Sequence, residues 1–239
     1  MSGKLYIIPT VLAEDTETEV LSRSITTTIA ALDHFLCENV RTARRYVSRL
    51  RVHASVESLH FELLDKDTLP DQLPALLQPL KEGHSMGLLS ESGCPGIADP
   101  GAAAVAYAHD QGIPVVPLVG PSSLILALMA SGLNGQQFAF HGYLPVDSRS
   151  SSTRIRALEK ESREKNQTQI FIETPYRNNK LLAALLDALA PNTRLCVAID
   201  LTAPSERIIC QTVAKWKKAK FQIGKVPVTF LFLADHEAR

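Results

Sequence analysis

Short apolar runs that alternate with longer amphipathic segments limit the possible folds of this 239-residue sequence more than any other feature. In the first half the apolar runs lie at residues 5–9, 34–38, 59–64, 86–90 and 113–119. Segments with a helical period lie between them, at residues 25–32, 39–50, 73–81 and 102–112. This alternation is typical of parallel strands joined by crossover helices. We therefore predict an N-terminal α/β domain with a parallel, doubly wound sheet.

The pattern changes near Gly120. A strongly apolar helix is expected at 124–132, and later apolar runs lie at 137–144, 169–174, 194–200, 207–213 and 228–234. Some of these runs are joined by short connections, which indicates a mixed sheet. Two more helices are expected among them, at 152–165 and 178–190. We place the domain boundary so that residues 1–119 form the N-terminal domain and residues 120–239 a C-terminal α/β domain with a mixed sheet.

Composition narrows the class of protein. Hydrophobic residues make up 45% and charged residues 21% of the chain, and the formal net charge is zero, as in an ordinary globular protein. Neutral charge removes a bulk attraction to nucleic acid, although local patches can still bind phosphates. The N-terminal apolar run is too short for a signal peptide, and no run is long enough to span a membrane. Four scattered cysteines, without a C-x-x-C pair or a nearby histidine, indicate reduced thiols, a cytoplasmic protein and no metal.

The segment SESGCPGIADPGAAA, Ser90 to Ala104, places three glycines and two prolines directly after a predicted parallel strand. Open α/β sheets bind ligands beyond the carboxyl ends of their strands, and glycine allows close approach of the backbone. Asp99 is expected to cap the following helix, with Pro100 at the first helical position. The alternative is an ordinary loop between a strand and a helix, because a single glycine-rich loop is a weak signal.

A second segment, VPLVGPSS, also follows a predicted strand. It turns through Gly120 and Pro121 into a helix whose first turn offers Ser122 and Ser123. Their hydroxyl and N–H groups could bind the carboxylate or ribose of a ligand, or they could simply cap the helix. The two segments together favour a ligand site more than either does alone.

Four motifs, SESGCPGIADPG, IPVVPLVGPSSLILALMASGL, FAFHGYLP and FIETPYR, occur in an order and spacing that resemble the tetrapyrrole-methylase superfamily of S-adenosylmethionine-dependent methyltransferases. Within it, the sequence is most similar to the ribosomal RNA small-subunit methyltransferase I branch, which methylates a cytidine 2′-hydroxyl in 16S RNA. The resemblance covers most of the chain from Ser90 onward. It implies two α/β domains with the cofactor in a cleft between them, and usually a homodimer.

Positions that match the family's motifs imply contacts with S-adenosylmethionine. The methionine and sulfonium end would be lined, largely through backbone groups, by Ser90, Gly93, Cys94 and Ile97. The turn near the domain boundary would contribute Pro121, Ser122 and Ser123. The adenine would be flanked by Phe171 and Ile172, with Thr229 completing that pocket.

The segment on the substrate side departs from the family. VLAEDTETEVLSRSI contains no glycine, where the family has a glycine-containing loop. Methyl transfer needs alignment of the nucleophile with the methyl group, and a base where the nucleophile carries a proton. The candidate bases are Glu38, Asp15 and Asp200. Glu38 ranks first because its segment, Cys37–Arg41, keeps the glutamate and the arginine of the family's A-E-D-T-R motif, and a surface or helix-capping carboxylate is the alternative.

Substrate contacts are expected from basic residues. The spacing of Arg41, Arg44, Arg45 and Arg49 places these side chains on one helical face, which could hold RNA phosphates or could be a solvated surface. By resemblance, Glu173 and Arg177 hold either structure or substrate.

The sequence therefore predicts a cytoplasmic methyltransferase that uses S-adenosylmethionine and acts on RNA. Two alternatives remain open. One is a methyltransferase of a tetrapyrrole or another small molecule, and the other is a non-catalytic relative that binds the cofactor only.

Overall fold

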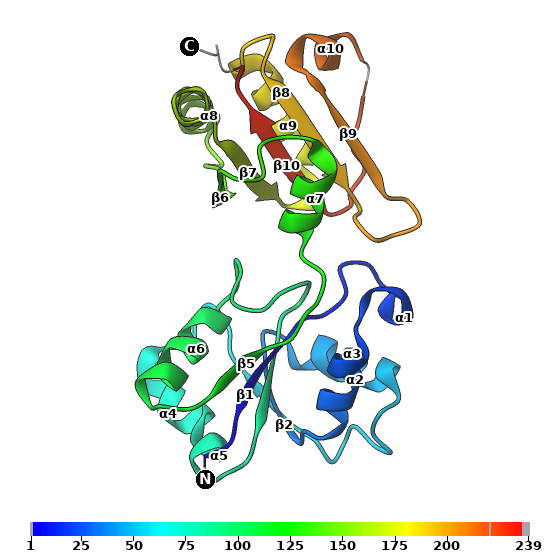
Figure 1. Ribbon diagram of the computed structural model, residues 1–239, viewed down its shortest axis with the longest axis vertical. Helices are drawn as coiled ribbons and strands as arrows, with labels where there is room; N and C mark the ends of the chain where they lie inside the picture. Colours follow the sequence, from blue (N-terminus) through cyan, green and yellow to red (C-terminus); the bar gives the residue numbers. More distant parts are fainter. Residues whose placement is uncertain (1, 220, 236–239) are drawn as a thin grey trace. The chain divides into compact units, whose positions relative to one another are not determined.

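The computed structural model describes residues 2–219 and 221–235. The chain divides into two compact units, residues 1–122 and 123–239, each with its own sheet (Figure 1). The division into compact units falls between Ser122 and Ser123, three residues after the boundary that the sequence pattern predicts between residues 119 and 120.

The first unit contains a five-stranded sheet in the described residues. Its strands are β1 (Leu5–Ile8), β2 (His34–Cys37), β3 (His60–Leu63), β4 (Met86–Leu89) and β5 (Val115–Pro117). Their order in the sheet is β3-β2-β4-β1-β5, and every neighbouring pair is parallel. The prediction of a parallel sheet is confirmed.

Helices cover both faces of this sheet. They are α1 (Glu17–Val20), α2 (Arg23–Ala30), α3 (Val40–Leu50), the 3₁₀ turn η1 (Pro70–Gln72), α4 (Leu73–Leu76), α5 (Gln78–Lys81) and α6 (Gly101–Asp110). Apolar residues of α2 and α3 pack in one core cluster, and those of α4, α5 and α6 pack in another on the opposite face. This double cover explains why β4 is buried at all four positions.

One helix prediction in this unit is wrong in detail. The segment 73–81 is not a single helix but two short ones, α4 and α5, that meet at Leu77 and Gln78. Pro79 has no N–H to donate to the carbonyl of Ala75, so a continuous helix would lose a hydrogen bond there. The predicted stop of α6 agrees with the backbone, because Gly112 has a left-handed φ of +64°.

The second unit also has five described strands, but they form a mixed sheet, as predicted. They are β6 (Phe138–Tyr143), β7 (Thr168–Glu173), β8 (Arg194–Ile199), β9 (Arg207–Thr212) and β10 (Val228–Leu233), in the order β6-β7-β10-β8-β9. Strands β6 and β7 are parallel, whereas the other neighbouring pairs are antiparallel.

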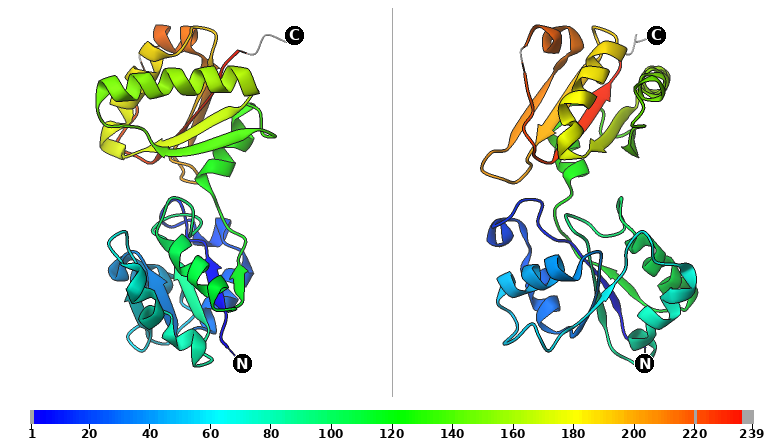
Figure 2. Two further views of the ribbon diagram at one scale, coloured as in Figure 1. Left: turned by 90° about the vertical axis from the view of Figure 1, so that its left-hand side faces the viewer. Right: turned by 180° about the vertical axis from the view of Figure 1, so that it is seen from behind.

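Helices flank this second sheet as well (Figure 2). They are α7 (Ser123–Ser131), α8 (Ser148–Lys165), the 3₁₀ turn η2 (Pro175–Arg177), α9 (Asn178–Ala188) and α10 (Val213–Lys218). Helices α8 and α9 supply the main core on one face, and α7 contacts β8, β9 and β10 on the other. Trp216 of α10 is almost fully buried, and its Nε1–H donates to the carbonyl of Leu195 at 2.9 Å.

Within the described part of the chain, none of the helices combines the length and the apolar character needed to cross a bilayer.

Candidate functional site

The candidate site of the first unit lies along one edge of its sheet. Because β1, β2, β4 and β5 are parallel, their carboxyl ends share this edge, where ligands bind in open α/β sheets (Figure 1). The segments that leave these strands there are residues 9–16, 38–39, 90–100 and 118–122.

The glycine loop after β4 needs glycine at its centre. Gly93 has a φ of +76°, and its carbonyl accepts hydrogen bonds from the N–H of Thr10 and the hydroxyl of Ser90, both at 2.9 Å. A Cβ at position 93 would lie only 3.1 Å from a methyl carbon of Leu12. The loop is therefore tied to the segment that follows β1, and it leaves little space for a side chain at that point.

Asp99 organises the second half of the loop. Its Oδ1 accepts the N–H groups of Gly96 at 2.6 Å and Gly101 at 2.8 Å. Helix α6 begins at Gly101 with Pro100 at the N-cap, so the expectation that Pro100 is the first helical residue is wrong. Asp99 does accept a hydrogen bond from an N–H of the first turn, that of Gly101. Burial raises the pKa of Asp99, and its Oδ2 is buried without a partner.

The two motifs suggested by the sequence lie side by side within this unit. The Cys94 thiol donates to the carbonyl of Pro121 at 3.3 Å. Gly120 packs so closely against Pro9 that a Cβ on it would lie 2.3 Å from the Pro9 Cβ. Ile97 and Val119 expose 49% and 81% of their surface, so apolar area flanks the loop. Exposed apolar groups beside open backbone suit a small ligand with apolar parts.

The residues predicted to bind the cofactor differ in burial and in the contacts that they already make within the protein. The Ser90 side chain is buried, and its hydroxyl is already bonded within the loop, so only its backbone remains for a ligand. Ser123 is the first residue of α7 in the second unit. There, Phe171 is fully buried in the core and stacks on Phe230. Ile172 and Thr229 are directly opposite each other on β7 and β10. The adenine contacts of these residues stay predictions.

Glu38 lies at the end of β2, beside the loop that follows the neighbouring strand β4. Its Oε1 accepts the N–H of Glu91 at 3.3 Å. Desolvation raises the pKa of Glu38, partly offset by that hydrogen bond, and the charges of Asp99 and Glu91 raise it further. Desolvation also raises the pKa of Glu91, opposed by a hydrogen bond from Thr42 and the charge of Arg45. A carboxylate with a raised pKa is suited to accept a proton at neutral pH.

Sequence reasoning did not include Glu91 and Asp99 among the possible bases, although both stand in the quoted glycine-rich segment. The signal that could have found them is the shared sheet edge, since both follow β4 and Glu38 follows β2. The other two candidate bases lie elsewhere. Asp15 contacts Arg49 at 3.4 Å, and Asp200, in the second unit, accepts from the hydroxyl of Ser205.

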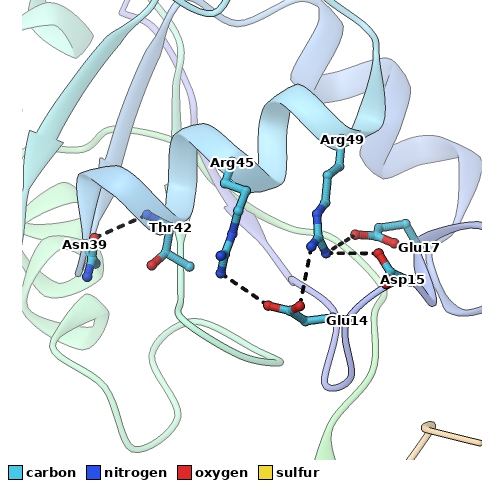
Figure 3. Close-up of polar contacts among 7 residues, drawn as sticks. All are labelled: Glu14, Asp15, Glu17, Asn39, Thr42, Arg45 and Arg49. Carbon is cyan, nitrogen blue, oxygen red and sulfur yellow. Dashed lines mark hydrogen bonds and ion pairs between the residues drawn. The ribbon is translucent and has the colours of Figure 1, made fainter.

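An acidic cluster, Glu14, Asp15 and Glu17, faces two arginines of α3 (Figure 3). Glu14 bridges them, with one oxygen 3.2 Å from Arg45 and the other 3.4 Å from Arg49. Arg49 also lies 3.5 Å from Glu17. These three carboxylates lie on the glycine-free segment, residues 11–25, which is called the acidic segment below. They face the arginine stripe, the face of α3 that carries Arg41, Arg44, Arg45 and Arg49.

The other two arginines of the stripe are not in this cluster. Arg44 lies over the ring of Phe61, 5.6 Å from its centre, and Arg41 is exposed. Two hollows flank the stripe. The smaller hollow, of about 100 Å³, lies beside the acidic segment and is bordered by Arg45 and Glu91. The larger hollow, of about 380 Å³, is bordered by Arg44, Arg45 and Ser48.

In the second unit, Glu173 and Arg177 form a tight pair. Both Glu173 oxygens accept from one Arg177 nitrogen, at 2.6 and 2.7 Å, and the Glu173 side chain is only 6% exposed. The pair borders a cavity of about 240 Å³ that Lys180 also lines. No group of three or more His, Cys, Asp or Glu side chains suited to a metal ion occurs among the residues that the structure describes.

Comparison with known proteins decides the family. The family model of the tetrapyrrole (corrin/porphyrin) methylases matches residues 19–216. The chain belongs to this family. The resemblance inferred from the four motifs is confirmed, and so is the α/β fold class.

Named relatives of this chain include two bacterial proteins called ribosomal RNA small subunit methyltransferase I. The protein of Mesorhizobium japonicum is 34% identical over 76% of this chain, and that of Vibrio cholerae is 32% identical over 85% of it. The matched part of the chain spans 58% and 67% of the lengths of these two relatives.

Solved structures share the fold of this chain. The methyltransferase CobJ matches with a TM-score of 0.63 at 16% identity, covering 98% of this chain and all of that one. Uroporphyrin-III C-methyltransferase of Thermus thermophilus, crystallised with S-adenosylhomocysteine, matches with a TM-score of 0.58 at 16% identity and 97% coverage of both chains.

Proposed function

We propose that this chain is an S-adenosylmethionine-dependent methyltransferase that acts on RNA of the small ribosomal subunit. The observation that carries the proposal is the meeting of the glycine loop and the Gly120–Ser122 turn at the carboxyl edge of the first sheet, with Glu38 beside them. The names of the relatives support the choice of RNA. A cytoplasmic location, expected from the scattered cysteines, and a homodimer, expected from the resemblance, belong to the same proposal.

The residues of the first unit fit the cofactor. Gly93 and Gly96 have no Cβ and therefore allow a ligand to approach the loop backbone closely, although the Gly93 carbonyl and the Gly96 N–H are already hydrogen-bonded within the loop and its surroundings. The buried, unpartnered Oδ2 of Asp99 is an acceptor for an amino or hydroxyl group of a ligand. Exposed Ile97 offers apolar surface to a thioether chain. When bound, the cofactor supplies an electrophilic methyl group on a sulfonium.

Glu38 serves as the base in this proposal. A ribose 2′-hydroxyl needs help to lose its proton, and a carboxylate with a raised pKa is a better proton acceptor than an ordinary exposed one. Glu91 holds Glu38 through its backbone N–H. Exposed Arg41 and Arg44 lie on α3, directly after the strand end that carries Glu38, where they can contact phosphates near a bound nucleotide.

Two measurements test the proposal separately. Isothermal titration with S-adenosylhomocysteine tests the cofactor, and absence of binding at millimolar ligand would refute it. Transfer of tritiated methyl groups from S-adenosylmethionine tests the acceptor, with small ribosomal subunits from a strain that lacks the gene as substrate. Uroporphyrinogen III serves as the small-molecule comparison. Labelling of uroporphyrinogen III without labelling of RNA would replace the RNA proposal, and binding of cofactor without any transfer would favour the non-catalytic alternative.

A further inference from the structure

The two arginines that face the acidic segment are held to different degrees (Figure 3). Arg49 contacts all three carboxylates, including Glu17, whose side chain is 14% exposed, and is itself 31% exposed. In the described residues, Arg45 forms an ion pair with Glu14 and also interacts with the charge of Glu91, and the side chains of Arg45 and Glu14 are well exposed, at 59% and 65%. Arg49 is therefore anchored, whereas the Arg45 pair is open to solvent.

An exposed ion pair of this kind is weak. Such pairs contribute about 0.2–1 kcal/mol, and salt screens them. A phosphate can form the same interaction with the guanidinium with more acceptor oxygens, and arginine is well matched to phosphate geometry. A backbone phosphate can thus displace Glu14 from Arg45 at low cost. The same exchange at Arg49 would leave the more deeply placed Glu17 without its cation.

Space around Arg45 agrees with this exchange. Arg45 borders both hollows beside the stripe, the smaller one under the acidic segment and the larger, polar one that it shares with Arg44 and Ser48. The larger hollow is lined by Arg45 but not by Arg49, and Glu57 is the one acidic residue among those that line it.

We propose that an RNA backbone phosphate binds Arg45 in the place of Glu14, while Arg49 stays paired with Glu17 and holds the acidic segment in position. The proposal rests on the RNA function proposed above and divides its arginine stripe into a binding residue and a positioning residue. Glu14 is then a competitor that weakens binding of any polyanion that does not fit closely enough to displace it. This carboxylate would determine specificity although it does not touch the substrate in the complex.

The test is the variant Glu14→Gln in the full chain. The probe is a fluorescein-labelled single-stranded RNA oligonucleotide, and its anisotropy is followed over a series of salt concentrations. Removal of the competing charge is expected to tighten binding about two- to fivefold, the equivalent of one exposed ion pair. The slope of log affinity against log salt is expected to stay the same in Glu14→Gln and to become shallower by about 0.7 in Arg45→Gln, because only the second change removes a phosphate contact with the single strand.

The matched control is Glu19→Gln. Glu19 is exposed on α1, outside the cluster, and its replacement changes the net charge by the same amount. A second comparison uses Arg45→Gln alone and together with Glu14→Gln. If Glu14 acts through Arg45, the gain from Glu14→Gln disappears in the background that lacks Arg45. Thermal melts of every variant show whether the fold is retained.

The outcomes separate the two proposals. If the wild-type chain binds RNA and Glu14→Gln behaves like Glu19→Gln, the competitor role of Glu14 is refuted and the RNA function stands. If the gain from Glu14→Gln persists without Arg45, the effect is one of overall charge, and the assignment of Arg45 is overturned. If the wild-type chain does not bind the oligonucleotide even at low salt, while it still binds S-adenosylhomocysteine, the RNA function and this inference both fail and the cofactor assignment survives.

Discussion

Replacement of Gly93 by alanine should separate ligand binding from stability. Gly93 has a φ of +76°, and left-handed backbone costs a residue with a Cβ about 1–2 kcal/mol. The new Cβ would lie 3.1 Å from a methyl carbon of Leu12, the end of a flexible side chain that can shift by a few tenths of an ångström. We therefore expect Gly93→Ala to lower the free energy of unfolding by about 1–2 kcal/mol, nearly all of it from the backbone.

The loss in cofactor affinity should be the more specific effect. The same Cβ would lie 3.4 Å from the carbonyl of Pro121, so it occupies the point where the two segments of the candidate site meet. If one backbone hydrogen bond to the ligand is lost, about 1–2 kcal/mol, the affinity for S-adenosylhomocysteine falls about five- to thirtyfold. Isothermal titration measures this change directly.

Gly112 provides the matched control. It has a φ of +64° and follows the last turn of α6, and a Cβ at this position would meet no atom of the described residues within 4 Å. Gly112→Ala should therefore cost the same 1–2 kcal/mol of backbone strain, while the affinity for S-adenosylhomocysteine stays unchanged. Far-UV circular dichroism follows the denaturation, and fluorescence of Trp216, the one tryptophan of the chain, follows the second unit. Wild-type affinity in Gly93→Ala, or an equal loss in both variants, would refute the assignment of the loop as a cofactor wall.

Three further predictions concern groups whose pKa is displaced. Burial raises the pKa of Glu38 above its ordinary 4.5, so the folded state binds this proton more tightly than the unfolded state does. The free energy of unfolding therefore falls as the pH rises from 4.5 to the raised pKa. Glu38→Gln should remove this slope in pH-dependent melts and lower kcat about 10²- to 10⁴-fold, whereas an unchanged kcat would exclude a role as base. Burial and the neighbouring His60 lower the pKa of His34, so stability should be lost as pH falls below 6.5, and His34→Gln should flatten that loss in the same melts. A hydrogen bond from Cys196 lowers the pKa of Cys210, so iodoacetamide at neutral pH should alkylate Cys210 before the buried Cys196, and equal labelling in a mass-spectrometric time course would contradict this.

The predictions that succeeded depend on local pattern. Alternation of apolar runs with helical segments is visible within short windows, and it was enough to predict a parallel sheet followed by a mixed one. Gly93 was marked by its position after a strand, and its left-handed backbone explains why glycine stands there. The break between α4 and α5 falls beside Pro79, but the apolar period continues through this residue and therefore predicts a single helix.

The contacts of the site could not be predicted in the same way, because they depend on strand order. Glu38 and Glu91 meet only because β2 and β4 are neighbours, although β3 lies between them in the sequence. The spacing of the arginines on α3 identified a face, but it contained no information about Glu14 and Glu17, which reach that face from the end of β1. Pairing across elements changes what a row of charges can bind, and only the fold reveals it.

The carboxyl edge of the first sheet concentrates features that cost stability. Ala98 holds a left-handed φ of +63° without the freedom of glycine, Asp99 keeps a buried oxygen without a partner, and Glu38 has a raised pKa. Each of these is unfavourable alone, and such features persist where binding or catalysis requires them. A ligand that satisfies the Asp99 oxygen and covers the loop would offset part of that cost, since any molecule that binds only the folded state stabilises it. The edge is therefore better explained as a binding surface than as an ordinary connection between a strand and a helix.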